Sequence, residues 1–167
     1  MIDFEERREE MEDFLSGMSL GVLCLSSGDE PYGIPINHAY VDGRLLLHCS
    51  HVGKKIDVLK ENPRVCFVVA TQSAPVKPHE TGEVCHIPSM SVICYGKARI
   101  VEDLEERTRA LNDFLRHYAP GAPALPEESV RACACIEIAV EEMTGRREGP
   151  AKKQVACWRW RFQSPPL

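Results

Sequence analysis

The sequence predicts a mainly β, α+β protein, an antiparallel barrel of six or seven strands with a few flanking helices. Short apolar or alternating segments recur along the chain, and several are joined by hairpin-type turns such as Asp42-Gly43. Few helical segments separate them, which argues against a doubly wound parallel sheet. A chain of 167 residues suits one domain, so we expect residues 1–167 to form a single unit.

The first half of the chain predicts a helix, a three-stranded meander and a short helix. Apolar residues at helical spacing predict an amphipathic helix over 3–18 that packs on the core. Strands follow at 20–26, 32–41 and 44–49, and Pro35 suits a strand edge or a bulge. A short helix over 53–62 ends before Pro63, because the residue before proline avoids the helical conformation.

The second half predicts strands at 65–70 and 91–101, the latter bent at Gly96. Asp103 is a suitable cap for a helix that runs to Tyr118. Strands at 132–140 and 155–162 complete a barrel over about 20–162. Trp158 and Trp160 share one strand face, which indicates core or dimer packing. Residues 71–87, with Cys85 and His86, lack periodicity, and a loop of that length is usually functional or mobile.

Composition excludes several classes of protein. The net charge is −5, with 20 Lys and Arg against 25 Asp and Glu, so no basic excess is available for a nucleic acid backbone. The sequence contains no apolar run long enough to span a bilayer, and its acidic beginning is unlike a signal peptide. We therefore expect a cytoplasmic protein without nucleic acid or membrane partners. Its cysteines, seven of which lie in apolar or strand-like runs, are predicted to be reduced core thiols.

Three kinds of catalytic or binding site have little support in the sequence. Zinc ligands from His79, Cys85 and His86 would lack paired Cys or His spacing, so no metal site is predicted. A nucleophile pair of Cys49 with His48 or His51 is disfavoured, because adjacent strand residues point to opposite faces. The glycine motifs of dinucleotide folds, P-loops and hydrolase elbows are missing from the sequence.

The segment LLHCSHVGKK at 46–55 predicts an anion site. A strand ends there, a short loop follows, and Lys54 and Lys55 open a helix. The first N–H groups of a helix and two ammonium groups suit a phosphate. The alternative is a solvated pair of lysines in a first helical turn. Because cations at a helix N-terminus oppose its dipole, an anion between the dipole and the lysines would remove that conflict.

Three segments carry a resemblance to a known family: GDEPYGIPINHAYVDGRLLLHCSHVGKKIDVLKENPRVCFVV, SVICYGKARIVEDLEERTRALNDFLRHY and AVEEMTGRR. Together they resemble the FMN-binding split barrels related to pyridoxamine 5′-phosphate oxidase, and most of all the branch of the nitroimidazole-resistance (Nim-like) flavoproteins. The similarity runs from about Gly21 to Arg147. It implies a Greek-key type split barrel and a homodimer with flavin sites at the subunit interface.

The resemblance also implies which residues hold the flavin. The phosphate would be bound by Gly53, Lys54 and Lys55 and by the preceding strand end. The isoalloxazine would lie along the strand at 34–38. Ser91 matches a position that contacts the cofactor. The implied set is Ile34, Pro35, Ile36, Asn37, His38, His48, Cys49, Ser50, Gly53, Lys54, Lys55 and Ser91. Trp158, Trp160 or the loop at 71–90 would come from the partner chain.

The chain departs from the oxidases in two places. Lys54 stands where they have arginine, which replaces a bidentate fork by a point charge. Their C-terminal substrate motif is not recognisable in CWRWRFQSPPL, so vitamin B6 oxidation is not expected.

We expect an FMN-dependent oxidoreductase that passes electrons from a reduced nicotinamide to a small acceptor such as a nitro-aromatic compound. His38 and His48 are the candidate proton donors, and each has the alternative of an ordinary strand histidine. A non-catalytic FMN or haem protein that stores, carries or senses its ligand remains an alternative. A ligand-free interaction module is a third, and it predicts a colourless protein.

Overall fold

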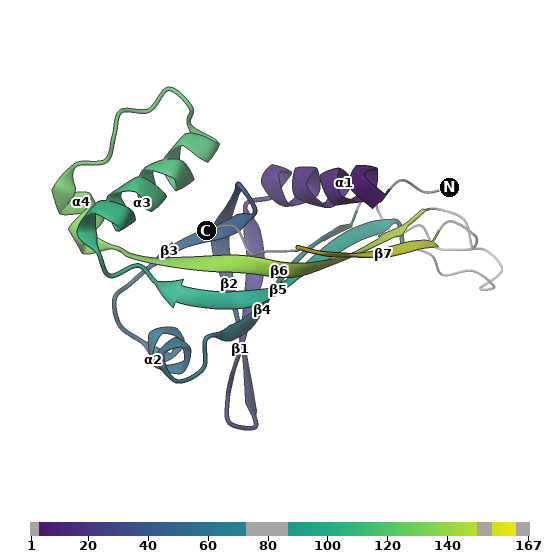
Figure 1. Ribbon diagram of the computed structural model, residues 1–167, viewed down its shortest axis with the longest axis horizontal. Coiled ribbons are helices and arrows are strands. Elements are labelled where there is room, and N and C mark those ends of the chain that lie inside the picture. Colours follow the sequence, from purple (N-terminus) through teal and green to yellow (C-terminus); the bar gives the residue numbers. More distant parts are fainter. Residues whose placement is uncertain (1–3, 73–86, 150–154, 163–167) are drawn as a thin grey trace.

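The computed structural model describes residues 4–72, 87–149 and 155–162. Within these ranges the chain forms seven strands and four helices (Figure 1). The strands are β1 Leu20–Ser27, β2 Glu30–Val41, β3 Arg44–Cys49, β4 Arg64–Gln72, β5 Ser89–Ile100, β6 Ala134–Glu148 and β7 Val155–Arg161. The helices are α1 Phe4–Gly17, α2 Lys54–Glu61, α3 Leu104–Tyr118 and α4 Glu127–Ala132.

Six of the strands close a barrel. The strand order is β3-β2-β1-β4-β5-β6-β7, all neighbours are antiparallel, and β3 also pairs with β6. The first half of β6 bonds to β3, from Arg44 opposite Ala139 to Cys49 opposite Ala134. Its second half bonds to β7 instead, so the sheet splits away from the ring there. The predicted antiparallel split barrel is confirmed, and so is the bend at Gly96, where the β5–β6 register shifts.

The strand predicted at 132–140 is too short, because β6 continues to Glu148. The run from Glu141 to Arg147 has no clear alternation in the sequence. In the structure its acidic residues find partners on other strands: Glu141 pairs with Arg64, and Glu142 pairs with Arg159 and Arg161. Ion pairing across strands therefore supports a strand that hydrophobic periodicity does not reveal.

The helices cover different parts of the barrel (Figure 1). Helix α1 lies over the sheet and buries Met11 and Leu15, as its periodicity predicts. Helix α2 buries Ile56 and Leu59 against the same core. Helix α3 begins where the Asp103 carboxylate accepts a hydrogen bond from the N–H of Glu106 at 2.8 Å, which confirms the predicted cap.

Helix α4 is absent from the predicted elements. It is six residues long and follows Pro126. The buried Asn112 of α3 holds the connection to α4, because its side-chain oxygen accepts from the N–H of Leu125 at 2.9 Å. With β3, the two helices enclose a second core around Leu46, Leu111 and Val130. No helix in the described ranges has the length and apolar character needed to cross a membrane.

The inner face of β7 packs under α1. Trp158 lies opposite Gly145, where an added Cβ would stand 2.5 Å from the indole nitrogen, so only glycine fits. The Arg7 guanidinium lies 5.0 Å from the centre of the Trp158 ring. Core packing of Trp158 and Trp160 is therefore confirmed. On the other face of β7 Cys157 is exposed, and the prediction that it is a core thiol is wrong.

Candidate functional site

The predicted phosphate-binding segment forms a corner between β3 and α2. Gly53 has φ of 112°, a conformation that strains residues with a side chain, and its carbonyl accepts the N–H of Ile56 at 2.8 Å. Helix α2 starts with the two lysines directly after it. We call Gly53, Lys54 and Lys55 the basic corner. Here the positive end of the α2 dipole and two ammonium groups occupy one place.

Lys54 connects the basic corner to the start of β2. Its ammonium lies 3.0 Å from Oε1 of Glu30 and 4.9 Å from the centre of the Tyr32 ring. The Lys54 and Glu30 side chains are 52% and 70% exposed. An ion pair this exposed contributes little to stability, so an incoming anion can replace Glu30 at small cost.

Lys55 is half-buried and lies near the end of β3. Burial raises the pKa of the Cys49 thiol, and the Lys55 ammonium opposes that rise. Cys49 therefore remains protonated at neutral pH. Ser50 accepts a hydrogen bond from the N–H of Val52 at 3.4 Å, which shapes the turn that leads into the basic corner.

His48 faces away from this arrangement. The His48 side chain lies on the same face of β3 as Leu46. The Cys49 side chain lies on the opposite face, from which Leu45 and Leu47 point into the barrel. The His48 ring meets Phe114 edge to face with centroids 4.9 Å apart, and it borders an apolar cleft of about 370 Å³ between β3, α3 and α4. The structure thus separates His48 from the other predicted phosphate ligands.

Strand β2 presents a free edge beside the basic corner. Within the described residues β2 pairs with β3 only at 38–41, so residues 30–37 bond to β1 on one side alone. Pro35 lies in this edge, as predicted. Ile34 and Ile36 pack towards the core, while Pro35 and Asn37 are exposed. The Asn37 amide donates to the carbonyl of Ser19 at 2.9 Å, which fixes its orientation.

His38 is fully buried inside the barrel. Its Nε2 lies 3.1 Å from the Leu15 carbonyl oxygen, and its ring meets Phe67 edge to face at 4.9 Å. Burial lowers the pKa of His38 to about 4, so the imidazole is neutral. Of the two alternatives in the sequence, this placement favours a structural strand histidine over a proton donor.

Ser91 borders a broad hollow on the outer face of the sheet. The hollow has a volume of about 750 Å³. It is lined by Ser91, Ile93, Tyr95, Thr144, Gly145, Arg146, Cys157, Trp158 and Arg159. The pairing register places Pro35, Val22, Val68 and Ile93 in one row across β2, β1, β4 and β5. These residues all point away from the barrel interior, but β2 and β5 are three strands apart in the closed ring, so the free edge of β2 and Ser91 lie on different sides of the barrel.

Tyr95, Thr144, Arg146 and Arg159 lie in this hollow but were not among the predicted site residues. Arg146 and Arg159 pair with Glu148 and Glu142. The missed signal was the continuation of β6 beyond residue 140, which would have placed Thr144 and Arg146 on the face of Ser91.

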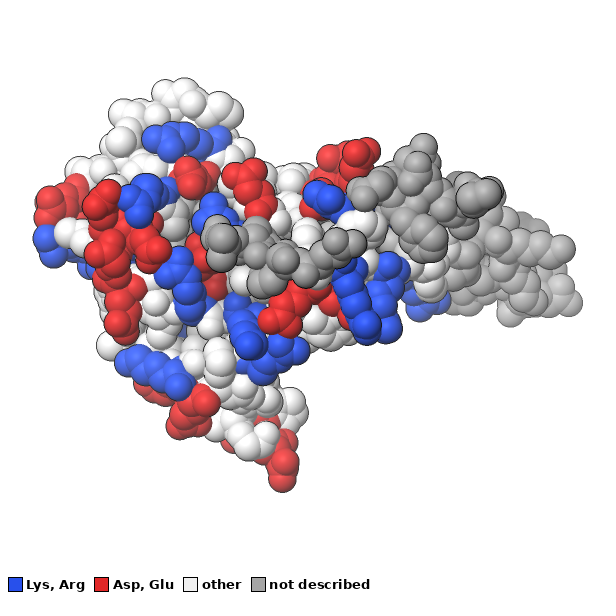
Figure 2. Space-filling model, viewed as in Figure 1, with Lys and Arg blue, Asp and Glu red and all other residues white. Residues whose placement is uncertain are grey.

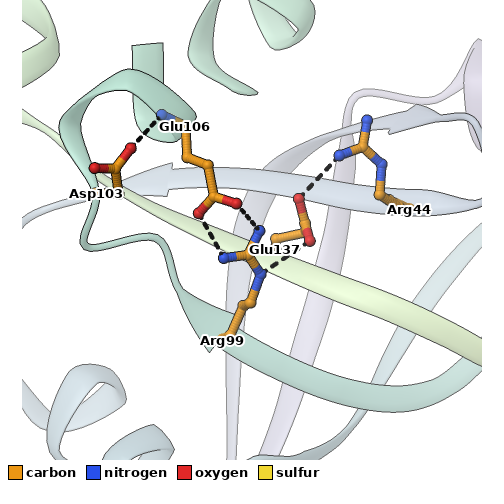
Figure 3. Close-up of polar contacts among 5 residues, drawn as sticks. All are labelled: Arg44, Arg99, Asp103, Glu106 and Glu137. Atoms are coloured by element: carbon orange, nitrogen blue, oxygen red, sulfur yellow. Dashed lines mark hydrogen bonds and ion pairs between the residues drawn. The ribbon is translucent and has the colours of Figure 1, made fainter. Parts of the chain in front are cut away.

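In a second cluster of charged residues, the basic and acidic side chains form ion pairs with one another (Figure 3). The Glu137 carboxylate, 10% exposed, accepts from Arg44 and Arg99 at 3.0 Å each. Arg99 also binds Glu106 at 2.9 Å. Both arginines are thus committed to internal carboxylates. Basic and acidic side chains are likewise interspersed over the described part of the face in Figure 2.

Comparison with known proteins agrees with this architecture. The sequence model of the pyridoxamine 5′-phosphate oxidase family matches residues 7–147. An uncharacterized protein of Rhizobium meliloti is 29% identical over 146 residues, which cover 83% of this chain and 91% of that protein.

Solved structures show the same fold. A candidate 5-nitroimidazole antibiotic resistance protein of Bacteroides thetaiotaomicron superposes with a TM-score of 0.72 at 25% identity, covering 91% of this chain and 86% of that one. A FAD and haem binding protein of Mycobacterium smegmatis gives a TM-score of 0.74 at 17% identity, with 96% and 86% covered. A FAD-binding protein of Mesorhizobium loti gives 0.61 at 23% identity, with 84% and 94% covered.

Proposed function

The chain belongs to the pyridoxamine 5′-phosphate oxidase family, and on this premise we propose that it is an FMN-binding oxidoreductase. It would pass electrons from a reduced nicotinamide to a small acceptor such as a nitro-aromatic compound. The observation that carries the proposal is the basic corner, a doubly basic helix start placed beside the free edge of β2. The similar proteins described as binding FAD or as acting in nitroimidazole resistance support the flavin and the acceptor class.

The basic corner fits a phosphate by its chemistry. The N–H of Ile56 bonds to the Gly53 carbonyl, so the N–H groups of Lys54 and Lys55 at the helix start are the ones available to an anion. Lys54 and Lys55 add two positive charges. Each ammonium is a compact charge with three rotatable donors, rather than the planar bidentate group of an arginine, and it can bind a terminal phosphate in more than one orientation. Lys55, being half-buried, is the better shielded of the two from salt.

The free edge of β2 suits the polar rim of a flavin ring. Its unpaired backbone carbonyls can accept hydrogen bonds, while Pro31 and Pro35 have no N–H to donate. Asn37 supplies a fixed amide next to them. FMN would bring the two-electron chemistry, while the protein binds and orients the ring. His38 is buried and His48 lies on the opposite face of β3, so neither histidine stands beside the proposed flavin site. The described residues include no obvious covalent nucleophile.

A homodimer is also part of the proposal, on the strength of the family resemblance. Trp158 and Trp160, which the resemblance suggests for a partner's site, pack under α1 of their own chain, and Trp158 also borders the hollow beside Ser91. Of the loop predicted at 71–90, residues 73–86 lie outside the described part of the chain. Light scattering on the purified protein distinguishes a dimer from a monomer.

The decisive experiment is reduction of the purified protein. We expect flavin absorbance, bleaching by NADH or NADPH in a stopped-flow instrument, and recovery of colour on addition of a nitroimidazole. If the protein is yellow but no donor reduces it, the non-catalytic binder is correct. A Soret band instead of flavin absorbance indicates haem, and a colourless protein that does not take up FMN contradicts the proposal.

A further inference from the structure

Cys24 and Cys66 face each other across two strands. The antiparallel pairing of β1 with β4 places them directly opposite, next to the pair Leu23 with Phe67, which is followed by Val22 with Val68. Leu23 and Phe67 are fully buried, so the alternating cysteines point to the outer face. Opposed residues of antiparallel strands have Cα atoms about 4.5–5.5 Å apart. A disulfide spans about 4.4–6.8 Å, so little backbone movement would be needed.

The two thiols interact. Both side chains are half-buried, and the Cys24 thiol donates to the Val22 carbonyl at 3.8 Å. Burial, followed by the proximity of the Cys24 thiol, raises the pKa of Cys66 to about 11. Cys66 therefore keeps its proton at neutral pH.

The neighbours of the pair leave it open on one side. Gly33 of β2 stands opposite Cys24 and carries no side chain. Tyr95 of β5 stands opposite Cys66 and is 38% exposed. A reagent can approach over Gly33, whereas Tyr95 shields the other end.

Within the described residues, no other cysteine that pairs in a strand faces a second cysteine. The opposed residues are Ala134 for Cys49, Phe67 and Met143 for Cys94, His48 for Cys135 and Arg146 for Cys157. Cys94 and Cys135 are buried in addition. The register thus singles out one pair with the geometry of a dithiol.

We propose that Cys24 and Cys66 form a dithiol modification site, which small-molecule disulfides oxidise to a cross-strand disulfide. The Cys24 thiolate attacks one sulfur of the small disulfide and releases one thiol, which leaves a mixed disulfide on Cys24. Cys66 then gives its proton to solvent, attacks the Cys24 sulfur and expels the second thiol. Two electrons pass from the protein to the small disulfide, and a dithiol reductant reverses the reaction. This proposal does not depend on flavin binding.

The test uses the full-length protein and oxidised glutathione over a range of glutathione redox buffers. We expect peptide mapping to find a peptide that links Cys24 to Cys66 and has lost two hydrogens. Phenylarsine oxide, which bridges two thiols, should form one adduct per chain that a dithiol removes. Because the wild-type protein is used, neither result depends on a variant that folds.

Variants assign the roles of the two thiols. Cys66→Ser should accumulate a glutathione mixed disulfide on Cys24, and Cys24→Ser should lose both the linked peptide and the arsenical adduct. Cys157→Ser removes an exposed cysteine without a cysteine partner, so it should change neither result. The proposal is overturned if no linked peptide forms at any redox ratio, if the link joins other cysteines, or if a subunit contact protects both thiols from iodoacetamide.

Discussion

Two pairs of basic residues, at different places in the barrel, differ in the burial of their carboxylate partners. Arg44 and Arg99 converge on the Glu137 carboxylate, which is almost fully buried, at 3.0 Å each. Lys54 and Lys55 open α2, and the carboxylate paired with Lys54 belongs to the largely exposed Glu30. The first pair is satisfied within the fold. The second adds positive charge at a helix end whose dipole already repels it, a conflict that the proposed anion from outside the chain would resolve.

The difference shows how a structural ion pair and a binding site can be told apart in one chain. Charges that meet inside the fold are unavailable to ligands, and removing one partner is costly because the other charge is left buried and unpaired. Charges whose partners are exposed contribute little to folding and can exchange partners. Substitutions in the two pairs should therefore affect different quantities, folding in one and flavin binding in the other.

The largest effect is expected from Lys54→Ala with Lys55→Ala. Two charge-assisted hydrogen bonds to phosphate are lost, each worth ~1.5–3 kcal/mol, so FMN affinity should fall by more than about a hundredfold. Fluorescence titration with FMN measures this, and the unfolding midpoint should hardly move. Lys60→Ala, at the other end of α2, is the matched control and should bind normally. Flavin retained by the double variant through dialysis would contradict the proposed phosphate site.

Glu137→Ala should show the reverse pattern. Removing the carboxylate leaves Arg44 and Arg99 without their shared partner, and we expect the free energy of unfolding to drop by about 2–4 kcal/mol. The loss stays below that of a completely buried pair because Arg99 is half-exposed. Urea denaturation measures the change, with Glu137→Gln as the variant that keeps size and one hydrogen bond. If Glu137→Ala unfolds at the same urea concentration as the unsubstituted protein, the Arg44 and Arg99 pair does not contribute to folding as proposed.

His38 is a titratable side chain that, unlike the two basic pairs, is buried with no carboxylate among its described contacts. Its pKa is lowered from 6.5 to about 4 in the fold, so the unfolded chain takes up the proton first as the pH falls. Stability linked to His38 is therefore complete above pH 6.5 and is lost between 6.5 and about 4, by about 2 kcal/mol at pH 5. His38→Gln should flatten this part of the stability profile in urea titrations at several pH values. An unchanged profile would mean that His38 is not the group responsible.

The smallest effect is expected from Glu30→Gln. It removes the carboxylate that competes with phosphate for Lys54, so FMN should bind about two- to threefold more tightly at low salt. The gain should vanish at high salt because both groups are exposed. Titrations at two ionic strengths measure it, and weaker binding would show that Glu30 assists the ligand instead.

Local chemistry in the sequence was enough to predict several turns and caps. Asp42 and Gly43 both adopt positive φ in the predicted hairpin, and Asp103 caps α3 as expected. The basic corner also follows from local order, since a strand, a glycine and two lysines are consecutive. Such features depend on neighbours within a few residues, and these are visible in the sequence.

Other features depend on contacts between distant segments. The second half of β6 is a strand because β5 and β7 pair with it, and α4 forms where Asn112 holds the preceding chain. Alternation predicts that His48 and Cys49 point to opposite faces, but only the packed helices show which face holds the apolar cleft.

Short-range sterics and periodicity are enough to predict the order of most strands and turns along the chain, the cap at Asp103 and the position of the doubly basic helix start. Which residues lie opposite one another follows only from the packing of the whole barrel. That packing brought Lys54 to the edge of β2, buried His38 and set Cys24 against Cys66. Those outcomes depend on strand register, which is set by burial of the barrel interior as a whole rather than by any single segment.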